Sequence, residues 1–359
     1  MSQAPVLILA GGTGGHVFPA LAVAEALRGL GASVHWLGAA DRLESRVAMQ
    51  NGIPFTGIEV AALRGRGIAR WLAAPWQLSR ALVEAMRRLR AIAPRVALGF
   101  GGFAAGPGAL AARLLGIPLL IHEQNRVPGL TNRVLARLAR RVLCGFPDAF
   151  PKSRCGEWTG NPVRAEIAAL PPPEARLARR EGRHRLLVLG GSQGAAFLNR
   201  TVPVALARLA PSQRPEVIHQ CGAAHREDCL AAYAKAGVEA RVEPFLEDMA
   251  AAYGWADLVL ARAGASTLAE ITAAGLASIL VPFPYAVDDH QTRNADFLVE
   301  HGAAVRIREA ELDPDGLAGW FTTLLGDERR RLAMAKAARA LARADAAEKV
   351  ALACLEEAR

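Results

Sequence analysis

Two glycine-rich turns, each directly after a short apolar run, constrain the fold of this chain more than any other feature. The first is residues 11–16 (Gly-Gly-Thr-Gly-Gly-His), after the apolar residues 6–10, and the second is residues 190–194 (Gly-Gly-Ser-Gln-Gly), after the apolar residues 186–189. At the start of a helix such a turn leaves backbone amides uncovered, and these bind anions. A glycine after a strand also makes a tight connection that binds nothing. Two matched copies nevertheless predict two nucleotide-type halves, each with a candidate phosphate cradle.

Short apolar runs separated by amphipathic stretches recur along the chain, as in parallel strands joined by crossover helices. The predicted strands are residues 6–10, 33–38, 96–100, 119–122 and 142–144 in the first half, and 185–189, 216–221, 241–243, 258–261 and 278–281 in the second. Residues 327–355 are alanine-rich and predicted to be helical. The pattern predicts an α/β fold with two doubly wound domains that face each other across a cleft.

Turn residues gather between Phe146 and Pro173, so we place the domain boundary in this stretch. The expected domains are residues 1–160, residues 161–340 and a last helix over residues 341–359 that can cross back to the first domain. The length of 359 residues and the 52% hydrophobic content agree with two folded domains of ordinary size.

The chain has no run of about 18 to 20 uncharged apolar residues, and its first ten residues lack the pattern of a signal peptide. We therefore expect a cytoplasmic protein that does not span a membrane. The cysteines are odd in number and lack metal-type pairing. We expect them to be reduced and structural, with no bound metal or cofactor: Cys144, Cys155, Cys221, Cys229 and Cys354.

Positive charge is concentrated in the first half. Residues 1–150 carry 17 arginines, no lysine and 7 acidic residues, a net charge of +10, while the whole chain has +9. This asymmetry suggests a polyanion or an anionic surface as partner of the first domain, and both nucleic acid and anionic lipid fit. Arginines on solvated faces explain the same composition without a partner.

The dinucleotide fingerprint Gly-x-Gly-x-x-Gly, with an acidic residue about 20 positions later, is absent from both turns. A third glycine-rich segment, residues 99–108, contains Gly102 and Gly106 and is either another anion-binding turn or a close strand-to-helix crossing. Residues 122–125 (His-Glu-Gln-Asn) end the next strand, where side chains of this fold project into the cleft. Glu123 is therefore a candidate catalytic group, with a solvated loop acid as the alternative.

His16 is the sharpest candidate for a catalytic base. A histidine at the first turn of a helix, beside a phosphate-type loop, is suited to taking up a proton near neutral pH. The alternative is a histidine that only caps the helix or packs against it.

In the second half, residues 262–270 (Arg-Ala-Gly-Ala-Ser-Thr-Leu-Ala-Glu) follow a predicted strand. Ser266 or Thr267 can cap the helix, its amides can face a diphosphate, and Glu270 can accept hydrogen bonds from ribose hydroxyls. An ordinary capped helix explains the serine and the threonine, but it does not explain the glutamate.

Two further polar segments follow in the second half. Residues 288–294 (Asp-Asp-His-Gln-Thr-Arg-Asn) offer amide and imidazole groups suited to sugar hydroxyls. Residues 313–315 (Asp-Pro-Asp) match a metal-binding Asp-x-Asp pattern, but we expect them to form a turn and cap a helix.

Five motifs occur in an order that resembles one family. They are residues 11–16, 122–125, 160–164 (Gly-Asn-Pro-Val-Arg), 190–195 (Gly-Gly-Ser-Gln-Gly-Ala) and the helix start at 264–270. Together they are similar to the MurG family, the UDP-N-acetylglucosamine:N-acetylmuramyl-(pentapeptide) pyrophosphoryl-undecaprenol N-acetylglucosamine transferases of peptidoglycan synthesis. The match runs across essentially the whole chain.

The resemblance implies a GT-B fold and an inverting transfer of N-acetylglucosamine (GlcNAc) from UDP-GlcNAc to the 4-hydroxyl of the muramoyl sugar of lipid I. The product is lipid II, formed at the cytoplasmic face of the membrane. The family places the donor mainly in the second domain and the acceptor in the first. His16 or Glu123 would take the acceptor proton, and helix-start amides with Arg164 would stabilise the leaving UDP.

Matching family positions residue by residue gives the expected contacts. Those to the donor are Ser192 and Arg164 for the diphosphate, Phe245 and Leu246 for uracil, Glu270 for ribose, and Thr13, Gly14, Gly15, Asn125, His290 and Gln291 for the sugar. The helix start adds Ala265, Ser266, Thr267, Leu268 and Ala269 to the donor site. The acceptor diphosphate is assigned to Gly14, Gly15, Gly102 and Gly106.

A polyprenyl-linked acceptor requires contact with the membrane surface, and residues 64–90 offer a candidate. Apolar residues recur there at three- and four-residue spacing among seven arginines: Ile68, Trp71, Leu72 and Trp76. Tryptophan with arginine suits the interface of an anionic membrane. The alternative is a helix that packs these side chains into its own domain. Arg137, Arg140 and Arg141 can extend the basic face.

Three other functions fit parts of the sequence. A UDP-GlcNAc epimerase shares the two-domain architecture but does not need a basic, tryptophan-bearing first domain. A nicotinamide-dependent oxidoreductase lacks its fingerprint. A nucleic-acid-binding protein would use the basic half, but no recognition helix or aromatic stacking motif is evident.

Overall fold

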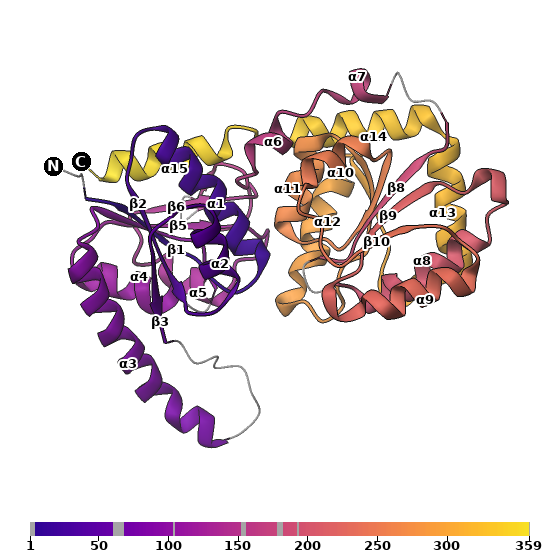
Figure 1. The fold of residues 1–359 in the computed structure, drawn as a ribbon. Helices are drawn as coiled ribbons and strands as arrows, with labels where there is room; N and C mark the ends of the chain where they lie inside the picture. Colours follow the sequence, from indigo (N-terminus) through magenta and orange to yellow (C-terminus); the bar gives the residue numbers. More distant parts are fainter. Residues whose placement is uncertain are drawn as a thin grey trace. The chain divides into compact units, whose positions relative to one another are not determined.

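Figure 1 shows the computed structural model of the chain, which describes residues 4–59, 68–102, 105–151, 156–177, 182–191 and 194–358, with side chains from residue 76 onward in the helix that begins at Ile68. The chain divides into two compact units. Unit 1 comprises Met1–Arg164 and Arg343–Arg359, and unit 2 comprises Ala165–Ala342. The first crossing thus falls after Arg164 rather than after residue 160, and the chain end belongs to unit 1.

Unit 1 contains a parallel seven-stranded sheet in the order β3-β2-β1-β4-β5-β6-β7. Its strands are β1 (Val6–Leu9), β2 (Val34–Ala39), β3 (Phe55–Ile58), β4 (Val96–Gly99), β5 (Leu119–Glu123), β6 (Arg141–Cys144) and β7 (Glu157–Trp158). Its helices are α1 (Gly14–Gly29), α2 (Leu43–Gln50), α3 (Ile68–Ile92), α4 (Ala105–Leu114), α5 (Leu130–Leu135) and α15 (Ala346–Glu357).

Helices cover both faces of this sheet (Figure 1). Val6 and Ile8 of β1 pack into a core with α1, α2 and α15, where Val350 and Cys354 of α15 are fully buried. On the other face α4 crosses β1 closely, because a Cβ atom on Gly108 would come within 2.8 Å of Leu9. The last helix therefore completes the core of unit 1.

Unit 2 repeats this architecture with a parallel six-stranded sheet in the order β10-β9-β8-β11-β12-β13. Its strands are β8 (Arg185–Leu189), β9 (Glu216–Gln220), β10 (Arg241–Glu243), β11 (Leu258–Ala261), β12 (Ala277–Leu280) and β13 (Ala304–Arg306). Its helices are α6 (Ala165–Ala168), α7 (Pro173–Leu177), α8 (Ala196–Ala207), α9 (Arg226–Ala236), α10 (Met249–Trp255), α11 (Ala265–Ala274), α12 (His290–Glu300), α13 (Pro314–Gly326) and α14 (Glu328–Leu341).

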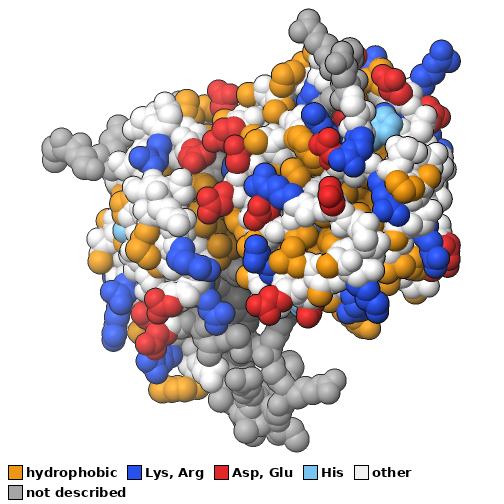
Figure 2. All heavy atoms as spheres, turned by 45° about the vertical axis from the view of Figure 1, so that its right-hand side comes forward, with side chains coloured by type: hydrophobic (Ala, Val, Ile, Leu, Met, Phe, Trp, Pro, Cys, Tyr) orange, Lys and Arg blue, Asp and Glu red, His pale blue; other side chains and the backbone are white. Residues whose placement is uncertain are grey.

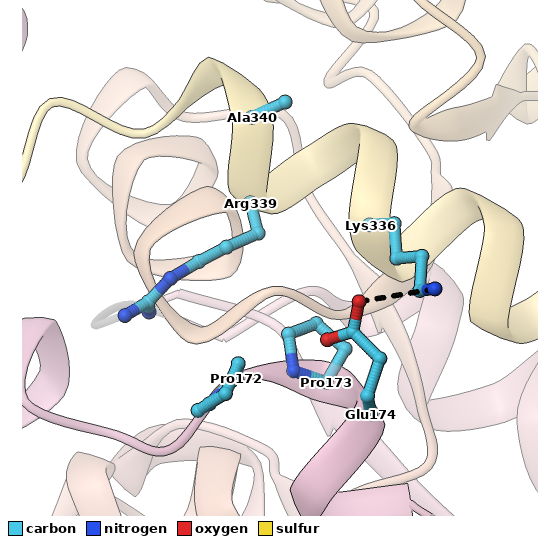
Figure 3. A pocket seen from close by; sticks show the side chains of 6 residues that line it. All are labelled: Pro172, Pro173, Glu174, Lys336, Arg339 and Ala340. Atoms are coloured by element: carbon cyan, nitrogen blue, oxygen red, sulfur yellow. Dashed lines mark ion pairs between the residues drawn. The ribbon is translucent and has the colours of Figure 1, made fainter.

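The segment that enters unit 2 from unit 1 packs along α14. Glu174 of α7 pairs with Lys336 at 3.0 Å, and the two line a pocket with Pro172, Pro173, Arg339 and Ala340 (Figure 3). Arg339 donates to the carbonyl oxygens of Ala168 and Leu170, both at 3.3 Å. These contacts fasten the chain to unit 2 directly after the boundary.

Every strand predicted from the sequence is present, but three strands were not predicted: β3, β7 and β13. All three are edge strands, and none exceeds four residues. The predicted helical stretch 327–355 consists of α14 and α15 with a break after Leu341, where the chain leaves unit 2, and α15 lies within the last helix expected over residues 341–359.

The described cysteines, Cys144, Cys221, Cys229 and Cys354, are buried free thiols, and Cys155 lies outside the described residues. Among the described helices, none is both long enough and apolar enough to cross a membrane.

Candidate active site

Each sheet reverses its strand order once, between β1 and β4 in unit 1 and between β8 and β11 in unit 2. In doubly wound sheets the loops at the carboxyl ends of these strands form the ligand site. All four loops here are glycine-containing segments identified in the sequence. The topology therefore brings the predicted motifs together in pairs, one pair in each unit.

In unit 1 the loops after β1 and β4 touch. A Cβ atom on Gly102, whose φ is +81°, would lie 2.2 Å from the carbonyl oxygen of Gly11 and 3.7 Å from Nδ1 of His16. Only glycine allows this approach, because any Cβ would overlap the neighbouring backbone. Gly102 and His16 are thus neighbours although 86 positions separate them in the sequence.

Two buried side chains that the sequence analysis missed hold the first glycine loop. The carboxylate of Glu44 accepts from the amides of Gly12 at 3.3 Å and Ala39 at 3.2 Å, and the indole of Trp36 donates to the carbonyl oxygen of Ala10 at 3.0 Å. Glu44 and Trp36 are both completely buried. An acidic residue in an amphipathic helix is normally expected at the surface. The sequence therefore gives no sign that Glu44 is buried and holds the glycine loop.

Helix α1 begins at Gly14 with Thr13 as N-cap. Its first turn holds no acidic residue, and within that turn the amide of His16 donates to the carbonyl oxygen of Thr13 at 3.0 Å. A Cβ on Gly14 would lie 2.9 Å from the ring of Phe18, which in turn lies under the guanidinium of Arg164 at 5.5 Å. The predicted anion cradle thus lies at a helix start, with Arg164 against the same helix through Phe18.

Glu123 organises the loop that follows β5. Its Oε1 accepts from the backbone and side-chain nitrogens of Asn125 at 2.9 and 3.2 Å, and its Oε2 accepts from the amide of Gly129 at 3.1 Å and the side chain of Asn132 at 2.9 Å. The residue is only 2% exposed. Burial raises the pKa of Glu123, and these hydrogen bonds act against that shift.

His122 connects this loop to the segment 160–164. Its Nε2 lies 3.0 Å from the carbonyl oxygen of Gly160, and Gln124 donates to its Nδ1 at 3.1 Å. Burial lowers the pKa of His122 to about 4, so the imidazole is neutral and donates from Nε2. Asn161 also bonds to the carbonyl oxygen of Gln124 at 3.0 Å. Two of the five motifs are thus joined through buried polar groups.

Gly106 lies in α4, where an added Cβ would be 3.7 Å from Thr131. This is an ordinary contact, unlike the one at Gly102. The intervening residues 103 and 104 lie outside the described part of the chain.

In unit 2 Gln220 ties the second glycine loop to the predicted uracil contacts. Its amide nitrogen donates to the carbonyl oxygen of Gly191 at 3.1 Å, and its side-chain oxygen accepts from the amide of Leu246 at 3.1 Å. Phe245 is 44% exposed, while Leu246 is buried. Ser192 lies outside the described residues. Gln220 is the last residue of β9, and it was not among the site residues predicted from the sequence.

The loop after β11 is fixed from several sides. Gln291 accepts through Oε1 from the amides of Ala263 at 3.2 Å and Phe283 at 2.9 Å. Since both partners are donors, its amide nitrogen must face the opposite way. The guanidinium of Arg262 contacts Val281, Pro282 and Glu309, and His290 bonds through Nδ1 to the carbonyl oxygen of Val287 at 2.8 Å.

Helix α11 begins directly after this loop, with Gly264 as N-cap and no acidic residue in its first turn. The predicted donor contacts occupy its first two turns: Ala265, Ser266, Thr267, Leu268, Ala269 and Glu270. Neither Ser266 nor Thr267 is the N-cap residue, so the predicted capping role is wrong for both. The hydroxyl of Tyr253 donates to Oε2 of Glu270 at 3.0 Å.

Asp313 caps α13, because its carboxylate accepts from the amide of Gly316 at 2.7 Å. The expectation that residues 313–315 serve a helix start is therefore confirmed.

Helix α3 presents a mixed apolar and basic surface. It buries Ala81, Ala85 and Leu89 at four-residue spacing, while Trp76 is 75% exposed. The alternative prediction, that this helix packs its apolar side chains into its own domain, is wrong for Trp76. The structure does not describe the side chains of Ile68, Trp71 and Leu72. Helix α3 packs beside α4, and α4 beside α5, where Leu130 and Val134 are exposed.

The expected extension of the basic face is reduced by ion pairs. Arg141 pairs with Glu157 and Glu356, both at 2.6 Å, and Arg140 pairs with Glu357 at 3.1 Å. On the face that Figure 2 shows, the described Lys and Arg side chains lie among acidic and apolar ones rather than in one continuous basic field.

Comparison with known proteins decides the family. The model of the glycosyltransferase family 28 N-terminal domain matches residues 6–144, and that of the family 28 C-terminal domain matches residues 185–350. The chain belongs to glycosyltransferase family 28. The N-terminal model spans β1 to β6 with the first glycine turn, and the C-terminal model spans β8 to β13 with the second.

Family 28 relatives match over nearly the full length. A protein of Xanthomonas axonopodis pv. citri is 58% identical over 99% of this chain and 82% of its own length. A protein of Xylella fastidiosa (strain Temecula1) is 57% identical over 98% of this chain and 97% of its own. Both are named UDP-N-acetylglucosamine--N-acetylmuramyl-(pentapeptide) pyrophosphoryl-undecaprenol N-acetylglucosamine transferase. The predicted family is confirmed.

Solved structures agree with this family 28 assignment. The crystal structure of MurG from Acinetobacter baumannii is 41% identical, with a TM-score of 0.81, and covers 98% of this chain and 99% of its own. The glycosyltransferase SnogD from Streptomyces nogalater is 18% identical with a TM-score of 0.65 over 99% of both chains, which shows the fold alone. The predicted α/β fold class with two Rossmann-like domains is confirmed.

Proposed function

We propose that this chain transfers GlcNAc from UDP-GlcNAc to the lipid-linked N-acetylmuramyl-pentapeptide, lipid I, and so forms lipid II for peptidoglycan synthesis. The observation that carries the proposal is the 57–58% identity over nearly the whole chain to relatives whose names specify this donor sugar and this acceptor. The site geometry supplies a group for each chemical task.

Unit 2 holds the nucleotide. Phe245 and Leu246 contact uracil, Glu270 accepts from the ribose hydroxyls, and the start of α11 faces the diphosphate. The amide nitrogen of Gln291 faces away from its two backbone donors and serves as a donor to the sugar. Ser192 and His290 complete the donor contacts expected from the family positions.

His16 is the base. Glu123 is 2% exposed and accepts four hydrogen bonds, so its carboxylate is committed to Asn125, Gly129 and Asn132. His16 instead stands at the first turn of α1, beside both glycine loops of unit 1. It takes the proton of the 4-hydroxyl of the muramoyl sugar as this oxygen attacks the anomeric carbon of GlcNAc. Glu123 positions Asn125, which contacts the donor sugar.

Charge that develops on the departing UDP is stabilised by helix-start amides and by Arg164. The first turns of α1 and α11 contain no acidic residue, so no carboxylate of either first turn repels an anion. Gly14, Gly15, Gly102 and Gly106 serve the acceptor diphosphate. The transfer is a single displacement and inverts the anomeric centre.

The protein meets the cytoplasmic membrane surface through α3 and α5, with no spanning segment required. Trp76 of α3 and Leu130 and Val134 of α5 are exposed apolar side chains, and the same two helices expose Arg80, Arg87 and Arg133. Such a face suits the headgroup region of an anionic membrane, with Ile68, Trp71 and Leu72 as further contacts.

The test is incubation of the purified protein with UDP-GlcNAc and a short-chain lipid I analogue, followed by mass spectrometry of the lipid and nucleotide products. The proposal predicts a disaccharide-lipid with release of an equal amount of UDP. Omission of the lipid is the control for nucleotide hydrolysis. Formation of UDP-N-acetylmannosamine without lipid product would instead support the epimerase.

A further inference from the structure

Tyr253 lies behind Glu270 in unit 2. Its hydroxyl donates to Oε2 of Glu270 at 3.0 Å, and its side chain is 0% exposed, whereas Glu270 is half-buried. A fully buried phenol cannot reach a nucleotide. The hydroxyl therefore acts on a ligand only indirectly, and the carboxylate of Glu270 is a group through which it can do so.

The backbone around this pair is also fixed. Nη1 of Arg176, in α7, donates to the carbonyl oxygen of Tyr253 at 2.8 Å, and Nη2 donates to those of Ala274 at 3.0 Å and Gly275 at 2.6 Å. Ala274 ends α11, the helix that carries Glu270. One guanidinium thus holds α10 and α11 in register, so the phenol and the carboxylate keep their separation.

We propose that Tyr253 is a positioning residue for ribose recognition: its hydroxyl holds the carboxylate of Glu270 in the orientation that accepts the ribose hydroxyls of a uridine nucleotide. This inference rests on the proposed function, in which Glu270 receives the ribose. A carboxylate offers about four lone-pair sites, so one bond from a phenol leaves it able to accept from a ligand. An acceptor that is already held in place loses less side-chain freedom on binding.

The experiment compares two ligands that differ only at the ribose. Calorimetry measures the affinity of UDP and of 2′,3′-dideoxyuridine diphosphate for the full-length wild type and for Tyr253→Phe, which keeps the ring and removes the hydroxyl. We expect the affinity for UDP to fall about 3- to 10-fold, the range of a typical hydrogen bond, and that for the dideoxy nucleotide to fall less than about 2-fold.

Tyr233→Phe is the matched control. Tyr233 is 3% exposed in the same unit, and its hydroxyl bonds to Nδ1 of His219 at 2.9 Å. We expect this variant to leave the ratio of the two affinities unchanged. In Glu270→Ala the two ligands should bind with nearly equal affinity, and adding Tyr253→Phe should have no further effect on the ratio.

The possible outcomes separate this inference from the proposed function. Equal weakening of both ligands by Tyr253→Phe would mean a packing role and would overturn the inference, as would no change in either affinity. A loss of folded protein lowers the number of sites in calorimetry without altering the ratio of affinities, so the ratio stays decisive. Absence of UDP binding in the folded wild type would instead count against the proposed function.

Discussion

Gly102 lies so close to Gly11 that a Cβ atom on Gly102 would stand 2.2 Å from the carbonyl oxygen of Gly11. The loops after β1 and β4 therefore depend on each other, and His16 is next to both. The approach of two backbones at the switch point of the sheet is what sets the position of the proposed base.

Replacing Gly102 by alanine should lower transfer activity at least tenfold, because the new methyl group forces the two loops apart. UDP affinity should stay unchanged, since the proposed nucleotide site is in unit 2. The control is Gly116→Ala, which has a similar φ of +74° but no atom within 4 Å of the new Cβ. Steady-state kinetics with calorimetry checks this, and equal losses in both variants would refute the role of the close contact.

His16→Gln and Glu123→Gln should differ in the pH dependence of kcat/KM. Loss of the base should lower the rate by about 10² to 10⁴ and remove the limb on the acidic side of the profile. Glu123→Gln places an NH₂ group against the donors from Asn125 or Gly129, so it should also be slow but keep the shape of the profile. A profile that loses its limb only in Glu123→Gln would assign the base to Glu123.

The buried histidines should make the protein less stable in acid. Burial lowers the pKa of His122 to about 4 and that of His219 to about 3, whereas an unfolded histidine titrates near 6.5. Below pH 6.5 these two histidines bind protons in the unfolded chain but stay neutral in the folded chain. The free energy of unfolding therefore falls as the pH falls. Between pH 6.5 and 5 each histidine should cost about 2 kcal/mol. Histidine NMR and urea unfolding check this, and midpoints near 6.5 would contradict it.

Trp76→Ala should weaken binding to vesicles that contain anionic lipid by about tenfold, because a large side chain no longer enters the interface. Met49→Ala is the matched control, since Met49 is 64% exposed on α2, which packs mainly with α1, β2 and β3. Sedimentation with vesicles measures both. If the two variants bind alike, α3 is not the membrane contact.

Much of the fold follows from local sequence pattern. The buried central strands are continuous apolar runs bounded by glycine turns, so β1, β4, β8 and β11 could be placed from sequence alone. The edge strands β3, β7 and β13 are mostly only partly buried or exposed and contain no continuous apolar run. They form because a longer neighbour offers unpaired backbone groups, which is a tertiary effect.

The supporting residues of the site were harder to predict than the residues of the motifs. Glu44, Gln220 and Tyr253 act on segments that are 17 to 32 residues away in sequence, and each looks like an ordinary helix or strand residue. Their roles depend on the register of the packed elements. Glycine turns, by contrast, can be predicted from the local sequence, because glycine readily adopts the positive φ angles that such turns need.

The most direct test of the whole account measures GlcNAc transfer from UDP-GlcNAc to a lipid I analogue and UDP affinity in the same preparations of wild type, His16→Gln and Glu270→Gln. We predict labelled disaccharide-lipid from the wild type, loss of transfer with intact UDP affinity in His16→Gln, and weakened UDP affinity in Glu270→Gln. A wild type that is folded and binds UDP, yet transfers no GlcNAc to the lipid, would contradict the account.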